Sequence, residues 1–328
     1  MRRSLHAVLA MVLGALASMS TVQARQLTEL GSKRRCAQYG GVPAGFATNK
    51  TAGMQFVPAG SFVPGSTQGY PEERGDEKPL QVASFYIDRT EVTYAQFERF
   101  VEATGHVTQA EREGSAAVFR VPTQAELGQR DFAWWTLVAG ASWRQPGGPG
   151  SKSQRNKPVV QVAYADALAY ARWLGHELPT EAQWEYAAKA GRTSDDLHHE
   201  PRDRTGHPTA NFWQGEFPLH NAREDGFAEQ APVGCYEPSP FGLHDMLGNV
   251  WEWTSNAYTA SHRGRDTADS GSCSPDTPGA RLVIKGGSFL CAASYCARYR
   301  VAARHMQEAS QPTMHLGFRT VLNTPQSL

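Results

Sequence analysis

The sequence predicts one mixed α+β domain with little regular secondary structure, and three observations support this fold class. The 328 residues include 31 glycines and 20 prolines, a composition typical of many turns and few long helices. Helix-start patterns occur only before Arg192, and helical periodicity is lost from there onward. No segment between residues 54 and 320 has the composition of an interdomain linker, because the Gly-, Ser- and Pro-rich stretch 139–157 is explained equally well as a surface loop.

The first expected elements are two strands and a helix. Residues 54–60 predict an apolar strand that ends in a turn, and residues 84–87 predict a second strand. Thr93 and Gln96 fit a capping box, in which each side chain satisfies a backbone N–H at the start of a helix. Gly105 is expected to end that helix.

The pattern of strand and helix recurs further along the chain. Residues 158–162 predict a short strand, and residues 165–174 predict a helix. Thr180 and Gln183 form another capping box, which opens a helix expected to stop at Gly191. We interpret the aromatic residues of these helices as core packing.

The N-terminus has the pattern of an export signal. Arg2 and Arg3 precede an apolar run over 7–19, and Val22-Gln23-Ala24 is a small-x-small cleavage pattern. An uncleaved anchor helix is the alternative. We therefore expect a signal peptide over 1–24, a poorly ordered lead-in over 25–50 and the folded domain over 51–324. The mature protein is expected to be secreted or periplasmic.

The charge balance excludes some classes of partner. Lys and Arg number 32, and Asp and Glu also number 32, so the formal net charge is +0. A general nucleic-acid binder needs a basic excess to neutralise phosphates, so we expect no nucleic-acid partner. No apolar run after the signal approaches the ~18 residues of a membrane span, so we expect no membrane attachment after signal cleavage.

The five cysteines fall into two groups. Cys36, Cys235 and Cys273 are scattered, and the sequence does not determine which of them pair. Cys291 and Cys296 are five positions apart, which matches neither a Cys-x-x-Cys redox motif nor a zinc knuckle. In an oxidising compartment, spacing alone favours a local disulfide between them. Two thiolates would also suit a soft, low-coordinate ion such as Cu(I).

Several segments closely resemble the formylglycine-generating enzymes of the sulfatase-modifying-factor family. In matching order they are 178–186, 211–218, 245–253, 281–291, 294–300 and 316–319. The similarity runs from about Met54 to Arg319. Most of these motifs mark only the wider fold, whereas the two cysteines after Gly286-Gly287-Ser288 are specific for the enzymes.

The resemblance implies a compact variant of the C-type lectin fold and a copper-dependent oxidase over 51–324. Cys291 and Cys296 would hold Cu(I) as thiolates. A cysteine in an extended sulfatase segment, Cys-x-Pro-x-Arg, would add a third sulfur and be converted to Cα-formylglycine with O2 and a reductant. Ser288 would lie beside the metal, and Trp251 would wall the oxygen pocket.

The resemblance also implies two calcium sites. The residues of the first would be Asn211 and Asp225 through their side chains and Phe212 and Phe227 through their carbonyls. Those of the second would be Asp245 and Glu252 through their side chains and Gly248 and Val250 through their carbonyls. Oxygen ligands drawn partly from the backbone suit Ca²⁺. The alternative is that these carboxylates cap turns or lie in solvent.

Some positions depart from the family pattern or have two interpretations. Ala292 stands where many members carry His, and Glu177 stands where Arg is usual. Tyr295, Arg298 and Arg300 are candidates for pocket walls and equally for structural contacts.

Two other functions are compatible with the same motifs. One is an exported oxidase of the same fold that acts on another substrate, such as a siderophore precursor. The other is a lectin-like binding module without catalysis, in which Cys291 and Cys296 form a disulfide.

Overall fold

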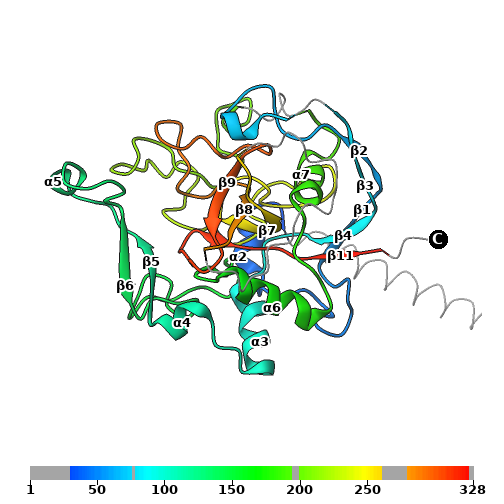
Figure 1. Cartoon of the computed structure of the whole chain (residues 1–328), viewed down its shortest axis with the longest axis horizontal. Helices are drawn as coiled ribbons and strands as arrows, with labels where there is room; N and C mark the ends of the chain where they lie inside the picture. Colours follow the sequence, from blue (N-terminus) through cyan, green and yellow to red (C-terminus); the bar gives the residue numbers. More distant parts are fainter. Residues whose placement is uncertain (1–29, 76–77, 194–198, 261–278, 325–328) are drawn as a thin grey trace, which may run out of the picture.

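Short strands in four small sheets organise the protein, as the computed structural model shows (Figure 1). The structure describes residues 30–75, 78–193, 199–260 and 279–324. One antiparallel sheet has the order β1 (Met54–Val57), β4 (Phe85–Asp88) and β11 (Val321–Asn323). A second has the order β10 (Leu316–Gly317), β7 (Trp251–Ala257), β8 (Arg281–Lys285) and β9 (Arg304–Glu308). Two hairpins pair β2 (Gly60–Phe62) with β3 (Leu80–Val82) and β5 (Ser115–Phe119) with β6 (Trp135–Ala139).

The helices of the described residues are short. They are α2 (Lys33–Gln38), η1 (Pro71–Glu73), α3 (Tyr94–Thr104), α4 (Gln109–Glu113), α5 (Gln124–Leu127), α6 (Tyr164–Leu174) and α7 (Glu181–Lys189). The expected mixed α+β class with little regular structure is confirmed. Within the described ranges, no helix combines the length and the apolar composition needed to cross a membrane.

The capping boxes identify the helix starts correctly. The Thr93 side chain accepts a hydrogen bond from the backbone N–H of Gln96, and Gly105 ends α3 with a left-handed φ of 67°. The Thr180 and Gln183 box opens α7 in the same way. That helix ends at Ala190, one residue before the expected Gly191, because Ala190 itself adopts the left-handed conformation.

The strand expected over 158–162 is wrong. Only Pro158 makes an isolated bridge, to Thr93. Gln161 has a left-handed φ of 59°, which interrupts an extended chain. Its side-chain amide donates to the carbonyls of Ala117, in β5, and Pro146, so the segment links β5 to a loop instead of forming a strand.

The N-terminal expectations meet the structure only in part. The expected signal peptide, residues 1–24, and Cys273 lie outside the described residues. The lead-in expected over 25–50 differs from the structure from residue 30 onward, because this part contains α2 and a disulfide between Cys36 and Cys235. This part of the chain also contributes Phe46 to the main hydrophobic core.

The main core lies between the sheet of β7 and β8 and the helices α3 and α6 (Figure 1). Phe97 of α3 and Tyr170 of α6 are fully buried there, as expected of helix aromatics in the core, and Trp253 of β7 packs with them. Residues 282–284 of β8 are buried in succession, because both faces of this strand are covered. The β5–β6 hairpin stands away from this core (Figure 1).

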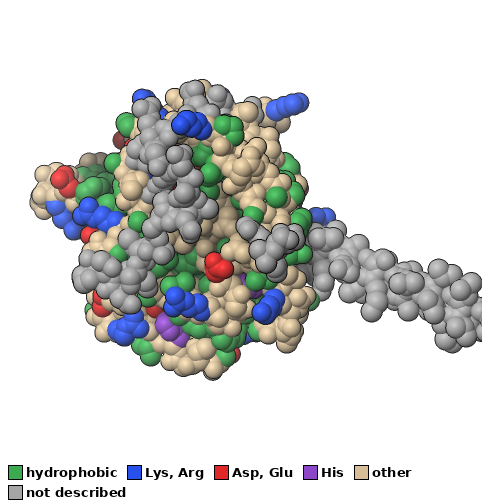
Figure 2. Space-filling model, turned by 45° about the vertical axis from the view of Figure 1, so that its right-hand side comes forward, with side chains coloured by type: hydrophobic (Ala, Val, Ile, Leu, Met, Phe, Trp, Pro, Cys, Tyr) green, Lys and Arg blue, Asp and Glu red, His purple; other side chains and the backbone are tan. Residues whose placement is uncertain are grey.

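Charged side chains link elements inside the protein. Arg319 binds Glu252 of β7, Arg304 binds Glu181 of α7, and Lys285 of β8 binds Glu185 of α7, all with almost no solvent exposure. On the face drawn in Figure 2, by contrast, Lys and Arg side chains are scattered and do not gather into one patch.

Candidate active site and cation sites

The loop after β8 brings the two candidate cysteines together. Gly287 has a left-handed φ of 78°, and a Cβ there would lie 2.6 Å from the carbonyl oxygen of Arg298. Only glycine allows this approach, so the two ends of the loop meet. Within the loop, Cys296 N–H donates to the carbonyl of Ala292, which forms a turn that returns Cys296 towards Cys291.

The two thiols face each other without a bond between them. Their sulfur atoms are 3.7 Å apart, whereas a disulfide requires about 2.05 Å. Cys291 is buried, and Cys296 is partly exposed. The local disulfide, which spacing alone favours, is therefore not formed in this structure. Two convergent soft sulfurs, one of them accessible, are a donor set that fits Cu(I).

Ser288 and Trp251 lie beside this pair in different ways. The backbone N–H of Ser288 points to the Cys291 sulfur at 3.4 Å, while its hydroxyl accepts the N–H of Leu290 at 3.2 Å. The hydroxyl therefore shapes the loop, and the contact with Cys291 is made by the backbone. Trp251 is buried in the same apolar cluster as Cys291, and its ring centre is 6.0 Å from that of His305.

Arg298, held by residues of a distant segment, forms a cationic wall beside Cys296. The Nη1 atom of Arg298 is 3.7 Å from the Cys296 sulfur, and its Nη2 atom binds the carboxylate of Glu72. The Arg298 guanidinium lies 4.2 Å from the ring centre of Tyr70. Arg300 lies over the same ring at 5.2 Å. Arg298 therefore contacts both Cys296 and Glu72, whereas Arg300 packs on Tyr70, which is a structural contact.

The surroundings give the two thiols different proton affinities. The hydrogen bond between Cys291 and Cys296 and the charge of Arg298 lower the pKa of Cys296 to about 6. Burial raises the pKa of Cys291. In the metal-free protein Cys296 is therefore the thiol of the pair that ionises more readily.

Replacing Arg298 with Met is expected to raise the pKa of Cys296, because the substitution removes the cation next to the sulfur and keeps much of the side-chain volume. We expect the alkylation rate of metal-free protein by iodoacetamide to rise with a midpoint near pH 6 in the wild type and at higher pH in the variant. Peptide mass spectrometry at Cys296 measures the rate. Arg298→Lys keeps the charge, so its alkylation midpoint should remain closer to that of the wild type. Identical midpoints in all three proteins would contradict the role of this charge.

Two histidines and an acidic residue of this wall were not identified from the sequence. Desolvation lowers the pKa of His305 to about 4 and that of His315 to about 3, so both imidazoles are neutral at pH 7. His315 packs on Trp135 at 4.8 Å between ring centres. In the sequence, only its position directly before the 316–319 motif could have drawn attention to His315. No sequence pattern pointed to Glu72, because it lies 226 positions before its partner Arg298 in the chain.

Two donors of the first candidate calcium site, the Phe212 carbonyl and the Asp225 carboxylate, converge on one amide. Gln214 donates its side-chain amide both to the Phe212 carbonyl and to the Asp225 carboxylate, at 2.8 Å for the latter. Asp225 is buried, and its other oxygen accepts the N–H of Phe227 at 2.9 Å. The Asn211 amide donates to Glu229, which leaves its oxygen as the potential ligand. These oxygens fit a hard cation, with the Gln214 amide now between them.

The second candidate calcium site fits only in part. Both oxygens of Glu252 bind Arg319, at 2.6 and 2.7 Å, and one also accepts the indole N–H of Trp184. Glu252 is therefore already neutralised by a fixed guanidinium. One Asp245 oxygen accepts the N–H of Gly234 at 2.5 Å, and the carboxyl also lies within hydrogen-bonding reach of the Glu91 carboxyl.

Glu91 is an acidic neighbour of this second site that the sequence did not suggest. One of its oxygens accepts an amide N–H from Asn249 at 3.0 Å, and its carboxyl lies beside that of Asp245. Burial raises the pKa of both carboxyls, that of Asp245 to about 6. The carbonyl oxygens of Gly248 and Val250 remain the expected backbone ligands. Across the described ranges, no three His, Cys, Asp or Glu side chains form a metal-binding group by themselves.

Comparisons with known proteins show which family the chain resembles. Residues 40–324 match the family described as sulfatase-modifying factor enzyme 1-like domain. The formylglycine-generating enzyme of Mycobacterium tuberculosis is 43% identical over 289 residues, which cover 81% of this chain and 96% of that protein. A Bos taurus protein named inactive C-alpha-formylglycine-generating enzyme 2 is 34% identical over 285 residues, which cover 82% of this chain and 88% of that protein.

A solved structure supports the fold. The structure of PvdO from Pseudomonas aeruginosa superimposes with a TM-score of 0.57 at 24% identity and covers 83% of this chain and 94% of that one. At this identity the likeness concerns the fold alone. Together with the family match, it confirms the compact C-type-lectin-like fold expected from the sequence motifs. The chain therefore belongs to the sulfatase-modifying factor enzyme 1-like family.

Proposed function

We propose that this protein is a copper-dependent oxidase that converts the cysteine of a sulfatase Cys-x-Pro-x-Arg segment to Cα-formylglycine. One observation carries the proposal: Cys291 and Cys296 face each other as free thiols at 3.7 Å beside the cation of Arg298. Relatives named formylglycine-generating enzyme, at 43% identity, support the same activity. Their names also support a sulfatase chain as the partner that is modified.

The overall conversion balances as one cysteine side chain, O2, two electrons and two protons giving an aldehyde, hydrogen sulfide and water. A thiol reductant is the proposed electron source. Copper, when bound by Cys291 and Cys296, supplies the one-electron chemistry of O2. The protein contributes a thiolate at Cys296 that Arg298 stabilises, a buried sulfur at Cys291, and an apolar wall at Trp251 that limits water.

We further propose export to an oxidising compartment, with residues 1–24 as the signal peptide and a secreted or periplasmic mature protein. The buried disulfide between Cys36 and Cys235 supports this location, because such bonds persist outside the reducing cytosol. Calcium is proposed as a structural cofactor. Its ligands would come from the oxygens around Asp225 and from those around Asp245.

The test is a direct conversion assay. The protein is loaded with Cu(I) and incubated with oxygen, a thiol reductant and a peptide that contains Cys-x-Pro-x-Arg. We expect a peptide mass loss that corresponds to an aldehyde in place of the thiol, and an adduct with a hydrazide probe. A peptide with Ser at the target position and protein kept free of copper are the controls.

An unchanged peptide under full copper loading would overturn the oxidase. In that case the family relationship with proteins named inactive would favour a non-catalytic binding module. Conversion of peptides regardless of the Pro and Arg positions would instead indicate another exported substrate.

A further inference from the structure

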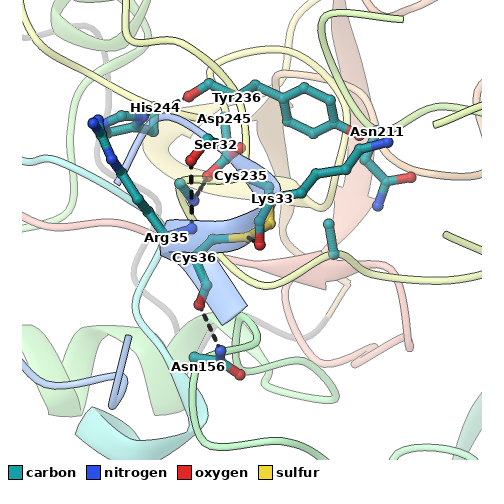
Figure 3. Close-up of a disulfide and its surroundings, with 12 residues drawn as sticks. Ser32, Lys33, Arg35, Cys36, Asn156, Asn211, Cys235, Tyr236, His244 and Asp245 are labelled. Carbon is teal, nitrogen blue, oxygen red and sulfur yellow. Dashed lines mark hydrogen bonds between the residues drawn. A yellow bond between two sulfur atoms is a disulfide. The ribbon is translucent and has the colours of Figure 1, made fainter. Parts of the chain in front are cut away.

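The N-terminal helix is covalently attached to the segment that carries the proposed calcium ligands. Cys36 of α2 forms a disulfide with Cys235, which is 199 positions later in the sequence (Figure 3). Cys235 lies between Asp225 of the first proposed site and Asp245 of the second. The disulfide therefore joins α2 to the loop that connects both sites.

Hydrogen bonds extend this attachment to the second site. The backbone N–H of Gly31 donates to the carbonyl of Gly234 at 2.7 Å, and the N–H of Gly234 donates to the Asp245 carboxylate at 2.5 Å. Gly234 has a left-handed φ of 73°, and a Cβ there would lie 2.6 Å from the Leu30 side chain. The residues before α2 thus pack directly on the backbone that orients Asp245.

Contacts on the other side reach the first site. The ammonium of Lys33, on α2, lies 5.9 Å from the ring centre of Phe227, whose carbonyl is a proposed ligand. Asn156 donates its amide to the carbonyl of Cys36 at 2.8 Å, and its own carbonyl accepts the N–H of Val233 at 2.8 Å (Figure 3). The helix is therefore linked to the ligand loop at Lys33 directly and at Cys36 both directly and through Asn156.

The helix has little to hold it apart from these contacts. It contains six residues, and isolated helices shorter than about 12–15 residues are marginal in water. Cys36 is its one buried residue, and its cap, Ser32, accepts the N–H of Arg35 at 3.4 Å. The position of α2 thus depends on the covalent bond at its single buried side chain.

We propose that the Cys36–Cys235 disulfide is an oxidation-dependent brace that holds α2 against the 225–245 segment and so raises the affinity of the proposed calcium sites. This inference rests on the calcium sites of the proposed function. The bond forms by thiol–disulfide exchange: the two thiols lose two protons and two electrons, and a partner disulfide is reduced to two thiols. Before this oxidation α2 is free to leave the loop, and calcium binds weakly.

The brace and the candidate active site differ in access to reductant. Cys36 and Cys235 are 1% and 3% exposed, whereas Cys296 is partly exposed. A reductant that keeps Cys291 and Cys296 as thiols therefore reaches the brace slowly. One chain can in this way contain an oxidised structural pair and a reduced reactive pair at the same time.

Calcium titration tests the brace. Wild-type protein and a Cys36→Ala/Cys235→Ala variant are stripped with a chelator and titrated with Ca²⁺ alone by calorimetry. We expect the variant to bind calcium about 10- to 100-fold more weakly, the range seen when groups that support metal ligands are removed. The matched control, Cys291→Ala/Cys296→Ala, removes two sulfurs elsewhere and should leave the calcium affinity unchanged.

Folding of each protein is checked by far-UV circular dichroism. If the variant does not fold, wild-type protein is reduced with dithiothreitol until mass spectrometry shows Cys36 and Cys235 as free thiols, and this form is titrated. If the folded protein without the disulfide binds calcium with wild-type affinity, the proposed brace is overturned. A wild type that binds no calcium would overturn the sites and the brace together. Neither result depends on peptide conversion, so failure of the oxidase proposal is recognised separately.

Discussion

Replacing Cys296 with Ser is expected to lower the conversion of a Cys-x-Pro-x-Arg peptide by about a thousandfold or more, because the residue acts in one unit with Cys291. A hydroxyl does not ionise near neutral pH, so the anion stabilised by Arg298 is lost. Oxygen is also a harder ligand than sulfur and holds Cu(I) poorly. Peptide turnover by mass spectrometry and copper content after gel filtration are the measurements.

The effects of the two cysteines should not add. Cys291→Ser is expected to lose as much activity as Cys296→Ser, and the double variant should lose no more than either. Ala293→Ser is the matched control, because it places a hydroxyl on an exposed position of the same loop without touching either sulfur. If the Cys296→Ser protein still converts the peptide at a tenth of the wild-type rate or faster, the cysteine pair does not take part in the reaction.

The second large effect concerns stability. Arg319→Met is expected to lower the free energy of unfolding by about 3–5 kcal/mol, because it leaves the buried carboxylate of Glu252 without its partner. Arg319 is fully buried, and it also donates to the carbonyls of Asp88 and His244. For a chain of 328 residues the loss corresponds to a fall in Tm of about 4–7 °C.

Urea denaturation in the presence of a chelator measures this loss without a contribution from bound cations. Arg155→Met is the matched control, since it breaks the exposed pair with Glu98 and should cost less than about 1 kcal/mol. Equal losses of unfolding free energy in the two variants would show that Arg319 is not needed to compensate the buried charge of Glu252. A larger loss for Arg319→Met in calcium than in chelator would indicate that the neighbouring Asp245 loop is affected as well.

Local hydrogen bonds explain why the helices could be predicted. The capping boxes at Thr93 and Thr180 close within three residues, so the sequence contains both partners of each bond. The strand expected over 158–162 failed for the opposite reason. Gln161 takes its conformation from partners near residues 117, 146 and 313, which no local pattern reveals.

The sequence by itself determined the mixed fold class, the principal helices and the motifs that identify the family. Only the tertiary structure decided that Cys36 pairs with Cys235, that Cys291 and Cys296 stay unbonded, and that Glu252 binds Arg319. The physical reason is the range of the interactions. Helix caps and turns depend on neighbours in the chain, whereas a disulfide, a sulfur pair or a buried ion pair depends on ångström-scale distances that are set when remote segments pack.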